Sequence, residues 1–301
     1  MSWHERSAVE LLALYARREV SPVEVLRDVL ARIERCEPTL AALWALDADT
    51  AIAAARASEV RWSKGEALPL DGVPVTIKDN IATRGVAVPL GCAATPLVPA
   101  AADAPPAARL REAGAVLVAK TTMPDLGMLS SGLSSFHKLA RNPWDTSKNP
   151  GGSSAGAAAA CAAGYGPLHI GTDIGGSIRL PAGWCGIVGV KPSLGRVPID
   201  PPYAGRVAGP MTRTVADAAL AMSVLSRPDA RDAMSLPFDP HIDWQSLDEI
   251  ELRGKRIGLW LDAGWGMSVE PEVQRVVEAA ARAFEQAGAI VEPLAPLTTR
   301  A

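Results

Sequence analysis

Cysteine and histidine are both scarce in this chain, with four of each among 301 residues. No two cysteines are spaced as C-x-x-C, and none lies close in sequence to a histidine. Zinc sites and disulfide scaffolds depend on such patterns, so we expect neither. Cys161 and Cys185 lie in stretches rich in alanine and glycine, where we expect each thiol to act as a small buried apolar group.

Long apolar runs and blocks of basic residues are also missing. No uncharged apolar run is long enough to span a bilayer, and the segment MSWHERSAVELL lacks the continuous apolar core and cleavage site of a signal peptide. The formal net charge is −3 and no basic stripe stands out, which argues against direct binding of nucleic acid. The sequence therefore predicts a cytoplasmic protein with no direct contact to a membrane or to nucleic acid.

Apolar residues make up 48% of the chain, which is sufficient for a sizeable core. The N-terminal part has the signals of helices. Ser7 with Glu10, and Ser21 with Glu24, each form the S-x-x-E pattern of a capping box. A further helix is expected over residues 50–62. We expect these helices to pack without taking part in chemistry.

Farther along the chain, β-branched runs alternate with helical stretches that are closed by glycine. A succession of strand, helix and strand is typical of a layered α/β fold. The expected strands cover residues 73–77, 115–119, 256–260 and 290–291, and the expected helices cover residues 106–113 and 271–287.

Two stretches rich in glycine and serine, Pro150–Gly156 and Gly171–Arg179, stand out in the middle of the chain. An alanine-rich segment follows the first stretch directly, which argues against a flexible linker. Neither stretch fits G-x-x-x-x-G-K-[ST] or G-x-G-x-x-G, so a nucleotide site is poorly supported and no cofactor is expected. A lone lysine, Lys78, ends an apolar run upstream of both stretches.

Two short hydrolase motifs fall in the same region. Residues 152–156 match G-x-S-x-G, with Ser154 as the nucleophile, but that motif needs a buried strand directly before it. Residues 144–150 are polar and end in proline, so this interpretation is disfavoured. Ser135 and Lys138 match S-x-x-K, but no K-T-G follows, and we interpret the match as chance.

A longer and ordered series of motifs is more specific than either of these short motifs. It begins with GVPVTIKDN at residues 72–80 and GAVLVAKTTMP at residues 114–124. The spacing from Lys78 to Ser153 is 75 residues, and the spacing from Ser153 to Ser177 is 24 residues. In these motifs and spacings the chain resembles the amidase signature family. The other matching segments are residues 142–144, 150–154, 171–181, 189–198 and 209–217.

The resemblance implies a Ser–cis-Ser–Lys triad, in which Ser177 is the nucleophile, Ser153 the bridging serine and Lys78 the base. It also implies a cis peptide bond between Gly152 and Ser153. It further implies that the backbone N–H groups of residues 174–177, which are Ile174, Gly175, Gly176 and Ser177, form the oxyanion hole. Asp173 and Arg179 flank this stretch, and we expect them to form a structural ion pair.

A lysine base also meets a physical requirement, because a serine hydroxyl is a poor nucleophile without a base in hydrogen-bond reach. None of the four histidines has a triad motif around it, and His169 is expected to pack in the core. The ordinary lysine pKa of about 10.4 has to fall to roughly 7–8, which costs about 4 kcal/mol and is within the reach of burial. A surface pair of Lys78 with Asp79 is the competing interpretation.

The resemblance implies an α/β fold in which helices flank a central mixed β-sheet. We expect a single domain over residues 1–301, with N-terminal helices over 1–65, a catalytic core over 66–220 and an α/β extension over 221–301. Family members continue well past the position of Ala301, so we expect the fold to be incomplete at its C-terminus. Ala155 stands where the family usually has glycine, and we expect its methyl group to be tolerated.

The expected function is hydrolysis of a small carboxylic amide to an acid and ammonia or an amine, through an acyl-enzyme on Ser177. The alternatives are the glutaminase subunit of a glutamine-dependent tRNA amidotransferase, and a truncated chain with little or no activity. Residues 198–206 carry no sign specific to the amidotransferase, which favours the first function. The substrate pocket is expected around residues 128–133 and 202–206, and a homodimer is the assembly considered.

Overall fold

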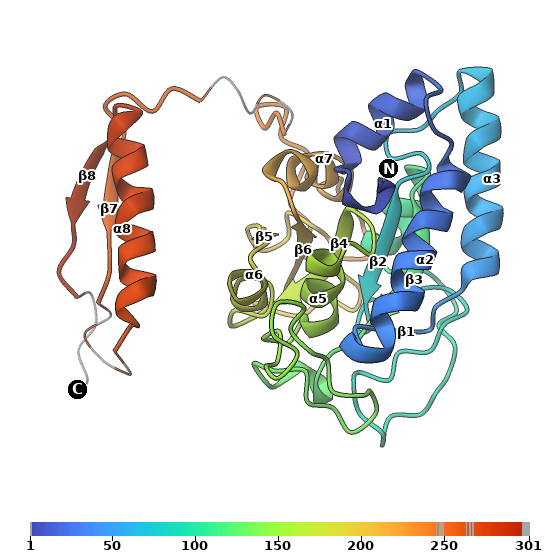
Figure 1. Ribbon diagram of the computed structural model, residues 1–301, viewed down its shortest axis with the longest axis horizontal. Helices are drawn as coiled ribbons and strands as arrows, with labels where there is room; N and C mark the ends of the chain where they lie inside the picture. Colours follow the sequence, from blue (N-terminus) through green and yellow to red (C-terminus); the bar gives the residue numbers. More distant parts are fainter. Residues whose placement is uncertain are drawn as a thin grey trace. The chain divides into compact units, whose positions relative to one another are not determined.

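The computed structural model of the chain describes residues 2–244, 246, 250–262, 264, 266 and 268–296. Contacts between residues divide the chain into two compact units, residues 1–245 and residues 246–301 (Figure 1). The first unit holds a six-stranded sheet, and the second holds a two-stranded sheet. The organisation as one domain over 1–301 stays a prediction, and Ala301 lies outside the described residues.

The sheet of the first unit is mixed, with the strand order β1-β3-β2-β4-β6-β5. Strand β2 runs parallel to both of its neighbours, β3 and β4, while β1, β6 and β5 pair in the antiparallel sense. The expected mixed sheet is therefore confirmed. The strands are β1 Leu43–Trp44, β2 Pro74–Lys78, β3 Val116–Thr121, β4 Leu168–Asp173, β5 Val188–Gly189 and β6 Val207–Thr212.

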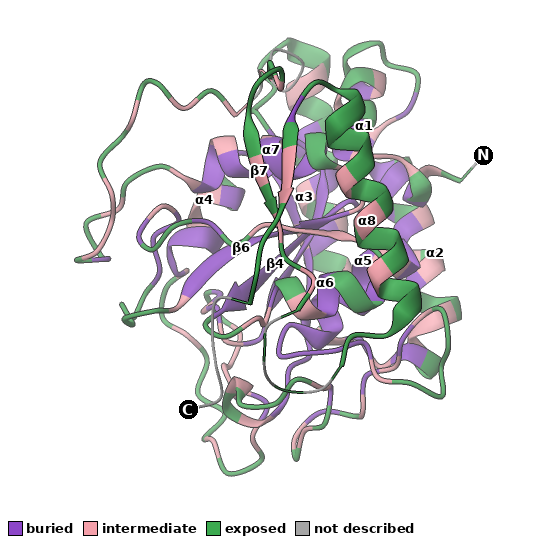
Figure 2. Cartoon of the chain, turned by 90° about the vertical axis from the view of Figure 1, so that its left-hand side faces the viewer, coloured by how far each residue is buried: buried purple, intermediate pink, exposed green. Residues whose placement is uncertain are grey.

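Helices cover both faces of this sheet, as expected (Figure 1). One apolar cluster joins α1, α4 and α7 to β2 and β4, and a second joins α2, α3 and α5 to β3. Figure 2 shows the strands between these layers as buried. In the described part of the chain, no helix is long and apolar enough to cross a membrane. The helices are α1 Ala8–Ala16, α2 Pro22–Leu40, α3 Ala48–Lys64, α4 Pro105–Glu112, α5 Ala155–Ala163, α6 Arg179–Cys185 and α7 Val215–Leu225, with short 3-10 helices at Trp3–Glu5 and Asp125–Gly127.

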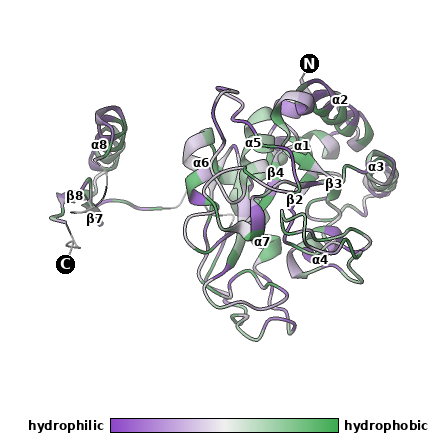
Figure 3. Cartoon of the chain, turned by 90° about the horizontal axis from the view of Figure 1, so that it is seen from below, coloured by the Kyte–Doolittle hydropathy of each residue, from purple (hydrophilic) through white to green (hydrophobic). Residues whose placement is uncertain are grey.

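The capping signals of the N-terminal helices are confirmed. The side chains of Ser7 and Ser21 each accept a hydrogen bond from the backbone of the glutamate three residues later, and both glutamates complete the capping box. Helix α3 begins before the expected residue 50, because Asp47 caps it by accepting from the N–H of Thr50 at 3.0 Å. Polar and apolar side chains share the surfaces of α2 and α3, as suits helices that pack on one face (Figure 3).

The second unit is a β-α-β motif, consisting of β7 Arg256–Leu259, α8 Pro271–Gln286 and β8 Ile290–Pro293. The two strands pair in parallel, from Arg256 opposite Ile290 to Leu259 opposite Pro293. These elements match the strands and helix expected from the sequence. No residue of α8 is buried, and the helix is mostly exposed in Figure 2.

A glycine near the start of α5 allows the helix to approach the sheet closely. The N–H of Gly156 donates to the carbonyl of Thr122 at 3.0 Å. A Cβ atom built on Gly156 would overlap the carbonyl oxygen of Ala42 and the backbone nitrogen of Thr122. Helix α6 also contains a glycine, Gly183, where an added Cβ would meet nothing within 4 Å. This pair of glycines offers a matched test of close packing.

We predict that Gly156→Ala lowers the free energy of unfolding by about 1–3 kcal/mol, because backbone atoms must shift to admit the methyl group. Gly183→Ala is expected to raise it by about 0.5–1 kcal/mol, since alanine is the better helix former. Urea denaturation followed by circular dichroism measures both changes. Similar effects of the two substitutions would contradict the packing of α5 described above.

Candidate active site

Three segments meet where the parallel strands β2 and β4 end. Lys78 is the last residue of β2 and Asp173 the last of β4. The N-terminus of α5 follows Ser153 and Ser154 directly, and α5 packs on these strands (Figure 1). The carboxyl ends of parallel strands are a common place for ligand sites in α/β folds. The fold thus brings Lys78 and Ser153 together, although they lie 75 residues apart.

The Lys78 amino group is surrounded by hydroxyl oxygens. The residue has no exposed surface. Its Nζ atom lies 2.8 Å from Ser153 Oγ, 3.0 Å from Ser154 Oγ and 3.0 Å from Thr172 Oγ1. The peptide bond between Gly152 and Ser153 is cis, as the resemblance implied. Two of the three predicted site residues are therefore in direct contact.

Burial lowers the pKa of Lys78 to about 7, because a charged ammonium loses its hydration inside the protein. The nearby charges of Asp79 and Asp173 act in the opposite direction, and the positive charge of Arg206 lowers the pKa further. The neutral amine is thus available near neutral pH, which is the form that accepts a proton.

The competing interpretation of a surface pair between Lys78 and Asp79 is wrong, because neither residue is exposed. The Asp79 carboxylate instead accepts from the N–H of Gly91 at 2.7 Å and lies 2.9 Å from Nε2 of His137. Asp79 therefore contributes charge near the lysine while its side chain is bound elsewhere.

Ser177 lines a cavity of about 280 Å³ together with Ser153. Its backbone carbonyl accepts from the N–H of Ser154 at 3.0 Å, which fixes the two serine segments against each other. Within the described residues, no hydrogen bond joins the hydroxyls of Ser177 and Ser153. The other residues that line the cavity are Asn80, residues 126–130, Thr172, Ile174, Gly175 and Arg206.

The glycine-rich turn before Ser177 is organised by Asp173. The expected ion pair with Arg179 is confirmed, with Nη2 at 2.9 Å and Nε at 3.0 Å from the carboxylate oxygens. Burial opposes the charge on Asp173, but the bonds from Arg179 and from the N–H groups of Ile178 and Gly176 hold its pKa well below the usual range. The carboxylate thereby fixes the shape of the turn.

One of the four expected oxyanion donors is already engaged. The N–H of Gly176 donates to Asp173 Oδ1 at 2.8 Å, so it is bound to a carboxylate and not directed at a substrate. In the described structure, the N–H groups of Ile174, Gly175 and Ser177 have no acceptor. These three donors are the ones that remain for an oxyanion, and their role stays a prediction.

Ser154 and Ser135 lie in surroundings that differ from those their motifs require, and their exclusion as nucleophiles stays a prediction. Ser154 has no strand before it and is fully buried against Lys78 and Thr172. Ser135 is exposed and bonds to Asp125 at 2.5 Å instead of to a lysine. His169 is buried in the core, 2.7 Å from Thr76 Oγ1, and burial lowers its pKa to about 3.

Cys161 and Cys185 are buried thiols, as expected from the small residues around them. Ala155 is fully buried as the first residue of α5, and it is not among the residues that line the cavity. Among the described residues, no group of three or more His, Cys, Asp and Glu side chains could hold a metal ion.

Thr172 and Ser154 stand in segments that match the family, but no pattern in the sequence predicts their contacts with Lys78. Thr172 lies within the glycine-rich stretch, one residue before Asp173, and its hydroxyl contacts both Lys78 and Asn80 at 3.0 Å. Residues 128–130 of the expected pocket loop do line the cavity. Of the second expected loop, over residues 202–206, it is Arg206 that lines it.

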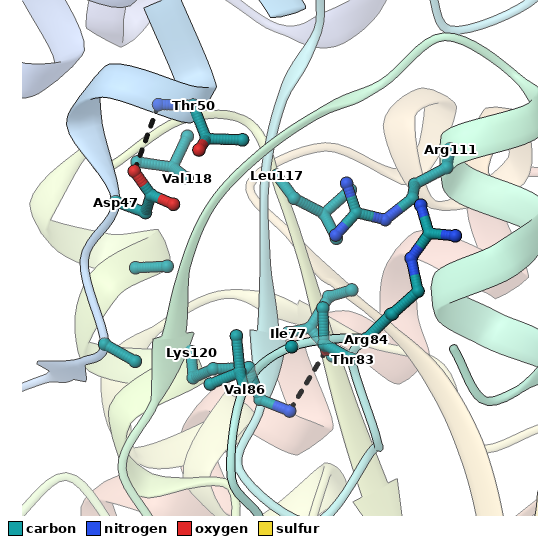
Figure 4. A pocket seen from close by; sticks show the side chains of 13 residues that line it. Asp47, Thr50, Ile77, Thr83, Arg84, Val86, Arg111, Leu117, Val118 and Lys120 are labelled. Carbon is teal, nitrogen blue, oxygen red and sulfur yellow. Dashed lines mark hydrogen bonds between the residues drawn. The ribbon is translucent and has the colours of Figure 1, made fainter. Parts of the chain in front are cut away.

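A second buried lysine, Lys120, lies in a different cavity of about 320 Å³ (Figure 4). Its Nζ atom donates to the carbonyl of Ile81 and, at 3.2 Å, to Thr83 Oγ1. Burial lowers its pKa to about 8. Among the described residues no serine lines this cavity, and Arg84 and Arg111 lie at its other side in Figure 4. Lys78 differs from Lys120 in that its amino group contacts two serine hydroxyls.

Comparison with known proteins agrees with this geometry. Residues 24–300 match the profile of the protein family described as Amidase. The chain belongs to the amidase signature family. The match spans the lysine, both serines and most of the described structure, so the resemblance seen in the motifs is confirmed.

Solved amidase signature structures share the fold. A bacterial aryl acylamidase of the family superposes with a TM-score of 0.89 at 37% identity, covering 96% of this chain and 61% of that protein. The peptide amidase from Stenotrophomonas maltophilia gives a TM-score of 0.86 at 33% identity, covering 96% of this chain and 62% of that one. These neighbours confirm the predicted fold class.

A similar level of identity links the chain to part of an amidotransferase. The A subunit of glutamyl-tRNA(Gln) amidotransferase from Methylococcus capsulatus is 39% identical over 295 residues, which cover 97% of this chain and 60% of that protein. The chain thus spans about 60% of the length of the amidase signature proteins that it matches.

The protonation of Lys78 can be measured directly. We expect its amino group to titrate near pH 7 in a ¹⁵N NMR titration of lysine-labelled protein, because burial destabilises the charged form. Lys120 is expected to titrate near pH 8 in the same experiment. Loss of one resonance in Lys78→Met assigns the signal. A midpoint for Lys78 near the ordinary lysine value of about 10.4 would contradict the site as described.

Proposed function

We propose that the chain is an amide hydrolase that cleaves a carboxylic amide to an acid and ammonia or an amine through an acyl-enzyme on Ser177. One observation carries the proposal. The buried amine of Lys78 lies 2.8 Å from Ser153 Oγ, and Ser153 shares a cavity with Ser177. A lysine whose pKa is lowered to about 7 is suited to accept the proton of a serine nucleophile.

In the first half of the proposed reaction, Ser177 Oγ attacks the amide carbonyl carbon. The Ser177 proton passes to Ser153 as the Ser153 proton passes to neutral Lys78. Catalytic hydrogen bonds often tighten only when substrate is bound, so the missing bond between the two serines is compatible with this relay. The N–H groups of Ile174, Gly175 and Ser177 would stabilise the oxyanion.

The intermediate then collapses by breaking the carbon–nitrogen bond. The proton held by Lys78 returns through Ser153 to the departing nitrogen, which leaves as ammonia or an amine. In the second half, water attacks the acyl-enzyme and gives its proton to Lys78 by the same route. The ester bond to Ser177 then breaks as the proton held by Lys78 returns through Ser153 to Ser177 Oγ, and the acid leaves.

The cavity limits the substrates that fit. A volume of about 280 Å³ is at the small end of the range for ligand sites. We therefore propose a small-molecule amide as the substrate. A cytoplasmic location and a homodimer, both expected from the sequence, remain part of this proposal.

A second candidate function rests on the relatives. Amidotransferase A subunits match this chain at 37–41% identity. This favours a role as the amidase subunit of a glutamine-dependent tRNA amidotransferase. Glutamine hydrolysis that appears only when partner subunits are added would support this role. Hydrolysis of simple aliphatic or aryl amides by the chain alone would support the free-standing hydrolase.

A serine-reactive fluorophosphonate tests the proposed nucleophile. We expect the label on Ser177, mapped by mass spectrometry, and loss of labelling in both Ser177→Ala and Lys78→Ala. Amide turnover is expected to fall at least about 10³-fold in Ser177→Ala, in line with other serine hydrolases. The matched control is Ser135→Ala, which removes an exposed hydroxyl outside the cavity and should leave labelling unchanged. Label on Ser154 or Ser135 would overturn the assignment.

A further inference from the structure

Among the residues that the structure describes, Arg206 contributes the one charged side chain that lines the cavity with the two serines. Its Nη2 atom donates to the carbonyl of Pro201 at 2.9 Å, and its guanidinium lies 5.5 Å from the ring centre of Tyr203. Its Nε atom is buried and has no hydrogen-bond partner within the described structure. A guanidinium held in place with an unused donor is equipped to bind one more acceptor.

Within the described residues, no carboxylate forms an ion pair with Arg206. The Asp173 carboxylate is occupied by Arg179 and by backbone N–H groups. The Asp79 carboxylate accepts from Gly91 and lies against His137. No acidic residue of the described part of the chain lines the cavity. The site therefore carries an uncompensated positive charge, which favours an anionic ligand.

We infer that Arg206 binds a carboxylate carried by the acyl part of the substrate, so that the preferred substrates are small amides of short dicarboxylic acids. This inference rests on the proposed function and adds a substrate class to it. The planar guanidinium presents donors in a fork that matches a carboxylate, which lysine cannot reproduce. The cavity of about 280 Å³ restricts the acyl chain to a few carbon atoms.

A carboxylate bound at Arg206 also changes the pKa of the neighbouring Lys78. The positive charge of Arg206 is one of the causes that lower the pKa of Lys78. A bound anion offsets that charge and therefore raises the pKa of Lys78. The pH at which the rate of hydrolysis reaches half of its maximum should therefore be higher for an anionic amide than for a neutral amide of the same size. A merely structural Arg206 would not produce this difference.

Succinamate and succinamide form a matched pair for the test, because they differ by a carboxylate in place of a neutral amide group. The wild-type chain is expected to favour succinamate in kcat/KM by about tenfold to a hundredfold, the range for hydrogen bonds to a charged group. Arg206→Gln should abolish the preference, mainly through a higher KM, and Arg206→Lys should retain part of it. Arg27→Gln, which removes an exposed arginine on α2, is the control. It should change kcat/KM for neither substrate.

The inference and the proposed function fail in different ways. Equal turnover of the two amides by wild type, or an equal loss on both in Arg206→Gln, would overturn the inference and leave the hydrolase in place. If neither these two amides nor simple aliphatic and aryl amides are hydrolysed, the proposed function fails. Calorimetric titration of Ser177→Ala then decides the inference alone. Tighter binding of succinate than of succinamide, lost on adding Arg206→Gln, supports it, and equal binding overturns it.

Discussion

The amino group of Lys78 lies wholly inside the protein, and the organisation of the site follows from how that group is satisfied. A buried ammonium is costly, so the group either finds acceptors or gives up its proton. The end of β4 and the segment that leads into α5 supply three hydroxyls within 3.0 Å of its Nζ atom. The same contacts that make burial tolerable also connect the lysine to the serines, so the packing of α5 and the basicity of Lys78 are parts of one arrangement.

Close packing of α5 depends on residues with little or no side chain. Gly156 allows the backbone of the helix to lie against Ala42 and Thr122, and the rest of the helix is mostly alanine. A larger residue at this point would move Ser153 and Ser154, which directly precede the helix. On the other side of the site, Asp173 holds the turn before Ser177 by accepting from its N–H groups. Two structural devices therefore position the two serines, and the hydrogen bond from the N–H of Ser154 to the carbonyl of Ser177 joins their segments.

Much of this could be predicted from the sequence. Lys78, Ser153 and Ser177 stand in motifs at set spacings, and the caps at Ser7 and Ser21 depend on residues only three positions apart. What could not be predicted depends on contacts between distant segments and on the direction of side chains in a turn. The N–H of Gly176 donates to Asp173, and among the described residues the Nε atom of Arg206 has no partner, although neither fact leaves a local pattern in the sequence. Asp47 caps α3, so the helix begins at Ala48 and not at the expected residue 50.

A neutral, buried Lys78 that activates Ser177 is the claim on which the proposed chemistry depends most directly. The measurement that tests it is the pH dependence of the second-order rate constant for phosphonylation of Ser177 by a fluorophosphonate. We expect a rate that rises as Lys78 loses its proton, with a single midpoint near pH 7, and that levels off above it. A rate that is independent of pH, or a midpoint near the ordinary lysine value of about 10.4, would contradict this role of Lys78.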